Sequence, residues 1–517
     1  MVDQKYLLDD EAMRDFIING YIVVKPSLPP DFHKSVFKQT LAVIENGGSL
    51  GNVLFSEVPM LQQVFDDPTV DGALTSILGQ NYAVNRHNAC HYHPPGSQGQ
   101  AFHKDYPLGG NVRYHRPRLA MAFYYPQDVT EDMGPTAIQP TTQYCMTPQN
   151  DAPGLALCGE AGTVTIVHYE LWHRATENRS DQIRFMLKFL FCRMEEPTRA
   201  SWNAGQPSWE SENMWAYAPT NGRIQHQAIW RHIWKWYHGG QNGEMRTHLD
   251  GASHNNGHAT VPIVELIKGL GSEDVSVRRT TADALRFAGA DSADEVVPAL
   301  AEKLNDPDEV VRLNAAYALG TIGESTIPTL MAALRRESET AWEPNLNRND
   351  YTNPSQLDSP FGLAAMGTPA LPALTAALDD PKWWVRAAAA MALGCMGPPA
   401  NPAAPPLIGA LKDESEWVRR NAADSLGNIG NPSSETTATR LVNALVVALD
   451  DKREVSRWSL SDSPFRENAI ATLAKMGQSS PGAMPALEKA LTDENEYIRS
   501  WAQIALGTSE KGLSTNG

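Results

Sequence analysis

The stretch Gln98-Gly-Gln-Ala-Phe-His103-Lys104-Asp105 places a histidine and a carboxylate two residues apart. On an extended strand, side chains at positions i and i+2 point to the same face. His103 and Asp105 would therefore present an imidazole nitrogen and a carboxylate oxygen to one small volume. Two histidines and one carboxylate form the facial triad that binds Fe(II) and leaves other positions open. This stretch supplies two of the three ligands, so the third must come from elsewhere in the chain.

A second stretch has the pattern of a β-hairpin. Residues 162–167 are rich in β-branched side chains and predict a strand that runs on to His173. A polar break at residues 177–182 follows, and residues 183–191 form a second apolar run. Two apolar runs joined by a short polar segment are typical of two antiparallel strands.

Within this hairpin, a turn centred between Asn178 and Arg179 would set His173 opposite Arg184. Residues directly opposite each other across two strands share a face of the sheet. An arginine beside a metal-binding histidine is well suited to grip a carboxylate with two parallel hydrogen bonds. The hairpin therefore predicts a third metal ligand together with an anchor for an anionic co-substrate.

These residues resemble the phytanoyl-CoA dioxygenase family of Fe(II)/2-oxoglutarate oxygenases over roughly residues 7–195. The motif residues that carry the resemblance are His103-x-Asp105, His173, Asn178-x-Ser180 and Arg184, with Asn19-Gly20-Tyr21 at the opening strand. The resemblance implies a double-stranded β-helix, which is a jelly-roll or cupin-like fold, with flanking helices. It also implies Fe(II), 2-oxoglutarate and O2 as cofactors. By resemblance, His103, Asp105 and His173 are the catalytic metal ligands, and Arg184 binds the distal carboxylate of 2-oxoglutarate.

Two positions depart from the family pattern. Ala175 stands where the family often has a serine, two residues after the distal histidine. Pro140-Thr141-Thr142-Gln143 stands where the family usually has Pro-Gly-Ser-His. Both departures concern contacts with co-substrate or substrate, and neither affects the three predicted metal ligands.

Other histidines compete for the predicted metal site. His91-Tyr-His93 has the same i, i+2 spacing as the first motif, but it also fits a core strand with hydrogen-bonded histidines. His168 lies five residues before His173, so on a strand the two would face opposite sides and only one could enter the site. The family spacing favours His173.

The composition predicts a soluble, cytoplasmic protein of two or three domains. The chain has 517 residues, of which 42% are hydrophobic, and no apolar run approaches the ~20 residues that span a bilayer. The N-terminus lacks the pattern of a signal peptide, and five cysteines without a CxxC pair favour reduced thiols. A net charge of −17 argues against nucleic acid or an anionic membrane as partner. All fourteen histidines lie between His33 and His258, which places iron chemistry in the first half.

Residues 1–195 are therefore predicted to form the oxygenase domain, and residues 196–258 form a tryptophan-rich extension and linker. Six tryptophans fall in this extension, and residues 228–237 place Trp230, Ile233, Trp234 and Tyr237 on one face of a helix. Two interpretations remain open. The extension could cover the substrate as a lid, or it could pack on the barrel or against the next domain.

Residues 259–510 repeat with a period that predicts an all-α HEAT-repeat solenoid of about seven units. An aspartate precedes an arginine by six residues in Asp306/Arg312, Asp380/Arg386, Asp413/Arg419 and Asp493/Arg499. We expect this recurring pair to form a structural ladder between neighbouring units. Insertions at residues 336–357 and 450–461 would emerge from one edge of the solenoid, either as a binding face or as tolerated surface loops.

The predicted function is an Fe(II)- and 2-oxoglutarate-dependent dioxygenase that hydroxylates or otherwise oxidises an unactivated C–H bond of a small organic substrate. The HEAT solenoid would serve as a scaffold, a site of self-association or an interaction platform. Two alternatives remain: a protein-modifying oxygenase whose repeats recruit the target, and a non-enzymatic interaction protein. The predicted triad and Arg184 argue against the last of these.

Overall fold

The structure is a computed structural model, in which two compact units are formed by residues 1–105 with 114–208 and by residues 209–517. It describes residues 2–48, 50–105, 114–149, 153–209, 224–240, 261–288, 292–341, 357–451, 453, 464–477 and 481–507. None of the helices in these ranges combines the length and the hydrophobicity needed to cross a bilayer.

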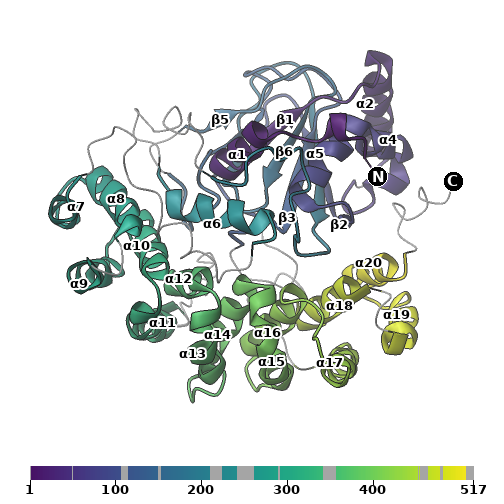
Figure 1. The fold of residues 1–517 in the computed structure, drawn as a ribbon. Helices are drawn as coiled ribbons and strands as arrows, with labels where there is room; N and C mark the ends of the chain where they lie inside the picture. Colours follow the sequence, from purple (N-terminus) through teal and green to yellow (C-terminus); the bar gives the residue numbers. More distant parts are fainter. Residues whose placement is uncertain are drawn as a thin grey trace. The chain divides into compact units, whose positions relative to one another are not determined.

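The first unit is built on two antiparallel sheets (Figure 1). The larger sheet has the strand order β1-β6-β3-β8-β2, and the smaller has the order β5-β4-β7. The strands are β1 (Tyr21–Val24), β2 (Ala83–His93), β3 (Leu119–Tyr124), β4 (Thr136–Ile138), β5 (Leu155–Ala156), β6 (Val164–His168), β7 (His173–Ala175) and β8 (Arg184–Cys192). The predicted sheet-based N-terminal domain is therefore present.

Strand β8 separates the interior of this unit from its outer face. All nine of its residues are buried, and successive side chains point to opposite sides. Met186 and Leu190 face inward, where they join a core cluster that includes Met121 from β3 and Ile138 from β4. Because this cluster draws on strands of both sheets, the two sheets pack face to face around it.

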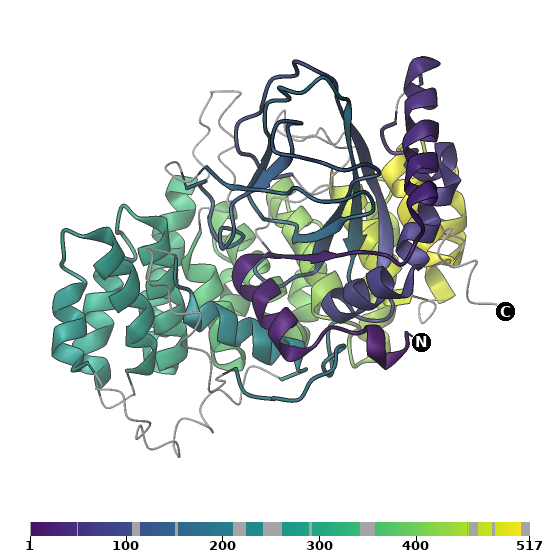
Figure 2. The ribbon, with the colours of Figure 1, turned by 90° about the horizontal axis from the view of Figure 1, so that it is seen from above.

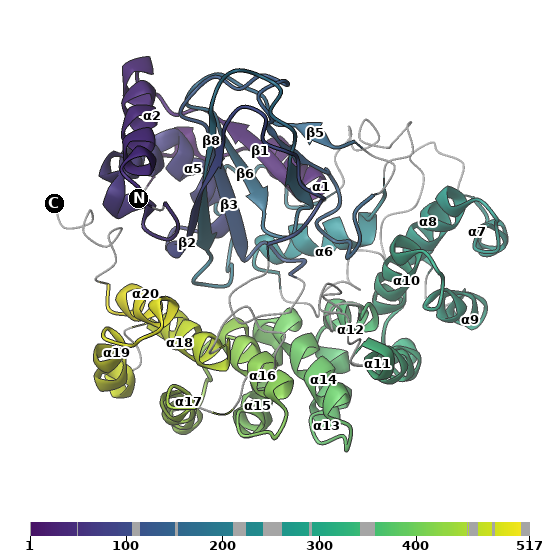
Figure 3. The ribbon, with the colours of Figure 1, turned by 180° about the vertical axis from the view of Figure 1, so that it is seen from behind.

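The odd-numbered residues of β8 face the N-terminal helices, which cover the outer side of the larger sheet (Figure 3). Phe65 lies with its ring centroid 4.6 Å from that of Phe189 and 5.1 Å from that of Phe191. Phe37 makes a similar contact with Phe185 at 5.1 Å. The helices are α1 (Asp10–Asn19), α2 (Pro30–Glu45), α3 (Leu54–Glu57), α4 (Gln62–Asp66) and α5 (Pro68–Leu78). Burial on both faces explains why this strand is almost continuously apolar.

The predicted hairpin between His173 and Arg184 is wrong. β7 pairs with β4 of the smaller sheet, whereas β8 pairs with β2 and β3 of the larger sheet, where Arg184 lies opposite His93. The polar break does not turn the chain back on itself but carries it from one sheet to the other. Asn178 fixes this crossing, because its side-chain amide donates to the carbonyls of His93 and Gln182, both at 2.8 Å.

The second unit is helical, as the repeating sequence predicts. Its helices are α6 (Gln227–Tyr237), α7 (Ile263–Gly269), α8 (Val275–Ala284), α9 (Ala293–Lys303), α10 (Glu309–Ile322), α11 (Ile327–Ala341), α12 (Ser359–Met366), α13 (Leu371–Ala377), α14 (Trp383–Met396), α15 (Ala404–Ala410), α16 (Glu416–Asn428), α17 (Glu435–Ala448), α18 (Pro464–Met476), α19 (Met484–Ala490) and α20 (Glu496–Ala505). From α7 to α20 the described helices pair in sequence order, giving seven pairs, and the even-numbered helices pack side by side in one row (Figure 1). Figure 2 shows the same helices from above.

The predicted ladder of arginine and aspartate links neighbouring repeats. Arg386 donates from Nε and Nη2 to Asp413 of the next repeat, at 2.7 and 2.9 Å. Its Nη1 also donates to the carbonyl of Asp380, six residues earlier, at 3.0 Å. Ion pairs to the next repeat recur in Arg278–Asp306, Arg312–Asp358, Arg419–Asp451 and Arg466–Asp493. Each of these arginines thus joins its own repeat to the following one.

The predicted insertions fall largely outside the described residues. Helix α11 continues to Ala341, so residues 336–341, predicted as the start of the first insertion, are helical instead. Most of the remainder, together with most of residues 450–461, is not described.

The described part of the tryptophan-rich extension divides between the two units. Trp202 donates from its indole nitrogen to Asp10 Oδ1 at 2.8 Å within the first unit. Within the second unit, Trp209 packs its ring against Trp234, and His226 Nδ1 lies 2.7 Å from Asn314 Oδ1 of α10. These contacts favour the packing interpretation of the extension, because they are made inside each unit.

Candidate metal centre

His103 and His173 are held together by the main chain. The His103 N–H donates to the His173 carbonyl at 2.9 Å, and the His173 N–H donates back to the His103 carbonyl at 3.0 Å. This exchange is an isolated antiparallel bridge beside β7. Opposite residues in such a pair place their side chains on one face, and the two imidazole ring centroids are 4.6 Å apart. The predicted first and third ligands thus meet through strand pairing, although not through the hairpin that the sequence predicted.

Each imidazole is oriented by a hydrogen bond from Nδ1 to a main-chain carbonyl. His103 Nδ1 lies 3.1 Å from the carbonyl of Ala101, and His173 Nδ1 lies 3.0 Å from the carbonyl of Leu171. A carbonyl only accepts, so Nδ1 must carry the proton, and the lone pair is left on Nε2. Metal-binding histidines are commonly oriented by such a bond from the other ring nitrogen.

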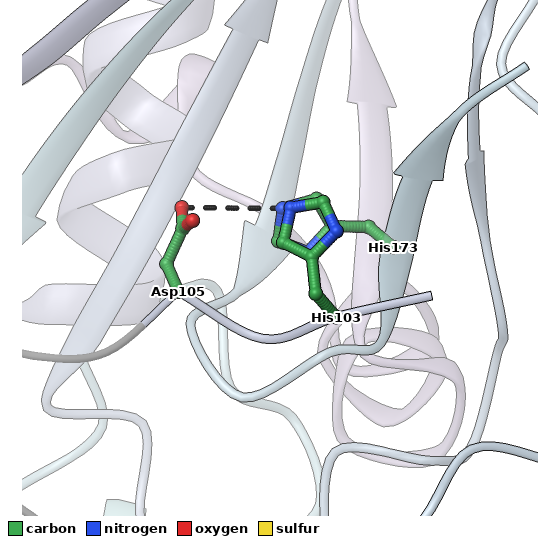
Figure 4. A group of neighbouring side chains, drawn as sticks. All are labelled: His103, Asp105 and His173. Atoms are coloured by element: carbon green, nitrogen blue, oxygen red, sulfur yellow. Dashed lines mark ion pairs between the residues drawn. The ribbon is translucent and has the colours of Figure 1, made fainter. Parts of the chain in front are cut away.

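Asp105 completes the group (Figure 4). Its Oδ2 lies 3.9 Å from His173 Nε2, and one ligand atom from each residue lies within 4.8 Å of the other two. Among the described residues, these three side chains form the one group of histidines, cysteines and acids whose ligand atoms lie close enough together to hold a metal ion. His173 is buried, and the other two are partly exposed. Two imidazoles and a carboxylate suit Fe(II), so the donor set fits the predicted metal.

The protonation states also suit metal binding. Burial lowers the pKa of His173 to about 4, so its imidazole is neutral near pH 7. Burial alone would raise the pKa of Asp105, but Lys188 and His173 outweigh it and hold that pKa below the usual range. The site therefore offers neutral imidazole and ionised carboxylate, the forms that coordinate metals.

A buried ion pair connects the two chain segments that carry the predicted metal ligands. Lys104, between the two ligands of the first motif, points away from them and places Nζ 3.3 Å from Glu170 Oε2. Glu170 lies three residues before His173, so the pair ties together the two segments that carry ligands. The two side chains are 7% and 8% exposed.

Arg184 lies fully buried at the start of β8, on the inward face of the strand. Its Nε donates to the carbonyl of Gly134 at 3.0 Å, and Nη1 lies 3.5 Å from the carbonyl of His91. Burial lowers the pKa of the guanidinium, which remains a cation. Carbonyls hold its orientation without neutralising its charge. The guanidinium charge of Arg184 is therefore available to bind an anion, as its predicted role requires.

Sequence reasoning missed Lys188. It is buried on β8 with Nζ 2.6 Å from Asp105 Oδ2. The available signal was a lone cation in an apolar run, four residues after Arg184 and hence on the same face of the strand.

The rival histidines lie outside the metal group. His93 Nε2 is 2.8 Å from the carbonyl of Thr176, and His91 belongs to no metal-binding group among the described residues. His168 accepts at Nδ1 from the N–H of Glu170 at 3.1 Å and packs near Tyr144. These positions favour His173 as the histidine of the predicted site.

A group of two histidines and one carboxylate is typical of non-heme iron oxygenases. Residues 19–186 match the family model of phytanoyl-CoA dioxygenase (PhyH), and residues 263–341 and 371–461 match that of HEAT repeats. The chain therefore carries a PhyH-family domain followed by HEAT repeats, and the resemblance predicted from the sequence is confirmed. The family match supports an oxygenase that depends on non-heme iron and 2-oxoglutarate. A search of curated proteins gave no match.

Several solved structures are similar to part of this chain. The non-heme monooxygenase ThoJ, in complex with Ni, is 17% identical, covering 38% of this chain and 84% of its own, with a TM-score of 0.30. The α-ketoglutarate-dependent carbocyclase SnoK from nogalamycin biosynthesis is 16% identical, covering 38% and 88%, with a TM-score of 0.31. CytC3 with Fe(II) and α-ketoglutarate is 13% identical, covering 37% and 79%, with a TM-score of 0.31.

Proposed function

We propose that this protein is an Fe(II)- and 2-oxoglutarate-dependent dioxygenase that hydroxylates an unactivated C–H bond of a small organic substrate. The observation that carries the proposal is the convergence of His103, Asp105 and His173, with both Nε2 atoms free to coordinate. When bound, Fe(II) supplies the coupled oxidation in which 2-oxoglutarate, O2 and R–H become succinate, CO2 and R–OH.

In this proposal, the protein holds the metal and positions the co-substrate. His103, Asp105 and His173 would hold Fe(II) and leave coordination positions for the co-substrate and O2. Arg184 receives the distal carboxylate of 2-oxoglutarate, supported by its burial and by partners that are neutral carbonyls. A bidentate guanidinium–carboxylate contact would fix both the distance and the orientation of the diacid.

Asp105 favours hydroxylation over halogenation. Related halogenases have a small residue in place of this carboxylate, which leaves a position for halide on the metal. Here the carboxylate is ionised and lies beside His173. We therefore propose that the enzyme is a hydroxylase. We also propose that the two face-to-face sheets form a double-stranded β-helix.

We propose that the HEAT array is a scaffold or an interaction platform rather than a part of the chemistry. Its recurring arginines and aspartates pair with one another between repeats, as Arg386 does with Asp413. Side chains engaged in such pairs are structural. The array also lacks histidine after His258, so imidazole ligands are confined to the first half of the chain.

The direct test is the Fe(II)-dependent conversion of 2-oxoglutarate to succinate. Wild-type protein should form succinate, and Asp105→Ala should abolish turnover. Asp31→Ala is the matched control, because its carboxylate lies on α2 with a side chain 93% exposed, and it should retain wild-type activity. Full activity in Asp105→Ala would contradict the proposed metal site.

A further inference from the structure

Lys188 is a buried cation directed at the metal site. It faces the interior with Arg184, because both occupy even-numbered positions on β8. Its cross-strand partner on β3 is Phe123, whose ring centroid lies 5.7 Å from that of His173. The Lys188 side chain is 5% exposed, and its Nζ lies 2.6 Å from Asp105 Oδ2. Among the described residues, Asp105 is the acid with which it pairs.

The charges of Lys188 and Asp105 cancel only when no metal ion is bound. Once Asp105 coordinates a divalent cation, the carboxylate, Lys188 and the metal together carry a charge of +2, and Arg184 raises it to +3. The dianion 2-oxoglutarate reduces the total to +1. A buried charge without a counter-charge is unfavourable, so the loaded site favours one more anionic group near Lys188.

Two unpaired imidazoles lie near the same ammonium. The Nε2 atoms of His87 and His91 are buried and have no hydrogen-bond partner among the described residues. Burial lowers the pKa of both histidines, and the nearby charge of Lys188 lowers it further, so both are neutral near pH 7. Buried polar atoms are normally hydrogen-bonded. Two orphaned nitrogens beside a lysine therefore point to a polar ligand.

Building on the proposed function, we propose that Lys188, flanked by His87 and His91, receives a carboxylate group of the primary substrate. The co-substrate is not the expected occupant. Lys188 lies four positions after Arg184, ~13 Å along the strand. In the proposed function the two ends of 2-oxoglutarate go to the metal and to Arg184, so the remaining charge of +1 near Lys188 calls for a second anion. The substrate class is thus a small organic acid.

The test uses the anaerobic protein loaded with Fe(II) and 2-oxoglutarate, followed by its visible charge-transfer band. The probes are straight-chain carboxylates from butanoate to decanoate and the primary amide of each. At least one carboxylate should shift the band saturably, and its amide should bind at least roughly 10-fold more weakly. Lys188→Met should weaken carboxylate binding by roughly 10- to 100-fold, the value of a charged hydrogen bond. Lys188→Arg should retain the preference, and Lys34→Met, on exposed α2, should behave as wild type.

Three results would overturn the assignment. One is that no carboxylate shifts the wild-type band, and another is that carboxylates and amides act equally. The third is that Lys188→Met weakens 2-oxoglutarate itself while carboxylate binding is unchanged, which would make Lys188 a co-substrate ligand. The comparison of acid with amide on wild-type protein holds even if Lys188→Met does not fold. Failure of the proposed function looks different, because the wild-type band would then be absent before any probe is added.

Discussion

Replacing Lys104 with methionine should break the ion pair that braces the two ligand-bearing segments. Lys104 Nζ lies 3.3 Å from Glu170 Oε2, and both side chains are buried. Methionine keeps the approximate length of the side chain, but the buried carboxylate of Glu170 loses the ammonium of Lys104 as its partner. Because Lys104 lies between His103 and Asp105, the disturbance should reach both predicted ligands.

The expected cost is large. Removing one partner of a buried ion pair costs about 3–5 kcal/mol, because the remaining charge stays buried. In a domain of 150–250 residues each kcal/mol moves Tm by ~2–4 °C, so the Tm of the first unit should fall by roughly 6–20 °C. Loss of a residue that orients ligands typically weakens metal binding by about 10- to 100-fold.

Scanning calorimetry of the metal-free protein and titration with Co(II) measure the two effects. Adding Glu170→Gln to Lys104→Met removes the stranded charge and should recover part of the lost Tm. The control is Lys34→Met, which removes a lysine from the exposed pair with Asp31, where the side chains are 70% and 93% exposed. Surface pairs contribute little. A Lys104→Met protein that melts and binds Co(II) like the control would refute the bracing role.

Three further predictions concern other parts of the molecule. Gly134→Ala should lower Tm and weaken 2-oxoglutarate binding, measured by calorimetric titration, because Gly134 has φ +71° and its added Cβ would meet two main-chain atoms at 2.8 Å. Burial lowers the pKa of His168 to about 3, below its unfolded value near 6.5. Its contribution to stability is therefore present above pH 6.5 and lost as pH falls toward 3. The free energy of unfolding of the metal-free protein, measured in urea, should therefore fall less steeply with falling pH in His168→Gln, by up to about 1.4 kcal/mol per pH unit. Arg386→Ala should cost the HEAT array about 2 kcal/mol in denaturant unfolding, because two charged hydrogen bonds to Asp413 are lost.

The sequence revealed features whose information is local. The i, i+2 spacing of His103 and Asp105 sufficed to predict that they meet, because it depends only on an extended backbone. The arginine and aspartate of the HEAT repeats were predictable for a similar reason, since a period repeated along the chain shows which residues recur at each junction. The same holds for strand β1, which begins at Tyr21, where the sequence placed the opening strand.

The sequence did not reveal which strands pair across the domain. The apolar runs around His173 and Arg184 have the pattern of a hairpin, but tertiary packing sends β7 and β8 to different sheets. Lys188 was missed because its role depends on this arrangement, in which β8 faces Asp105 from the opposite sheet. The packing of α6 against α10 likewise rests on contacts between distant residues, such as His226 with Asn314.

The most direct test of the iron and 2-oxoglutarate site is an anaerobic titration of the protein with Fe(II) and 2-oxoglutarate, followed by visible absorption. A metal-to-ligand charge-transfer band requires 2-oxoglutarate to chelate the iron, so it reports both cofactors together. We predict a saturable band in wild-type protein that weakens in Arg184→Ala, because the distal carboxylate loses its buried cation. Absence of the band in wild-type protein would contradict the central claim, and an unchanged band in Arg184→Ala would contradict the assigned anchor.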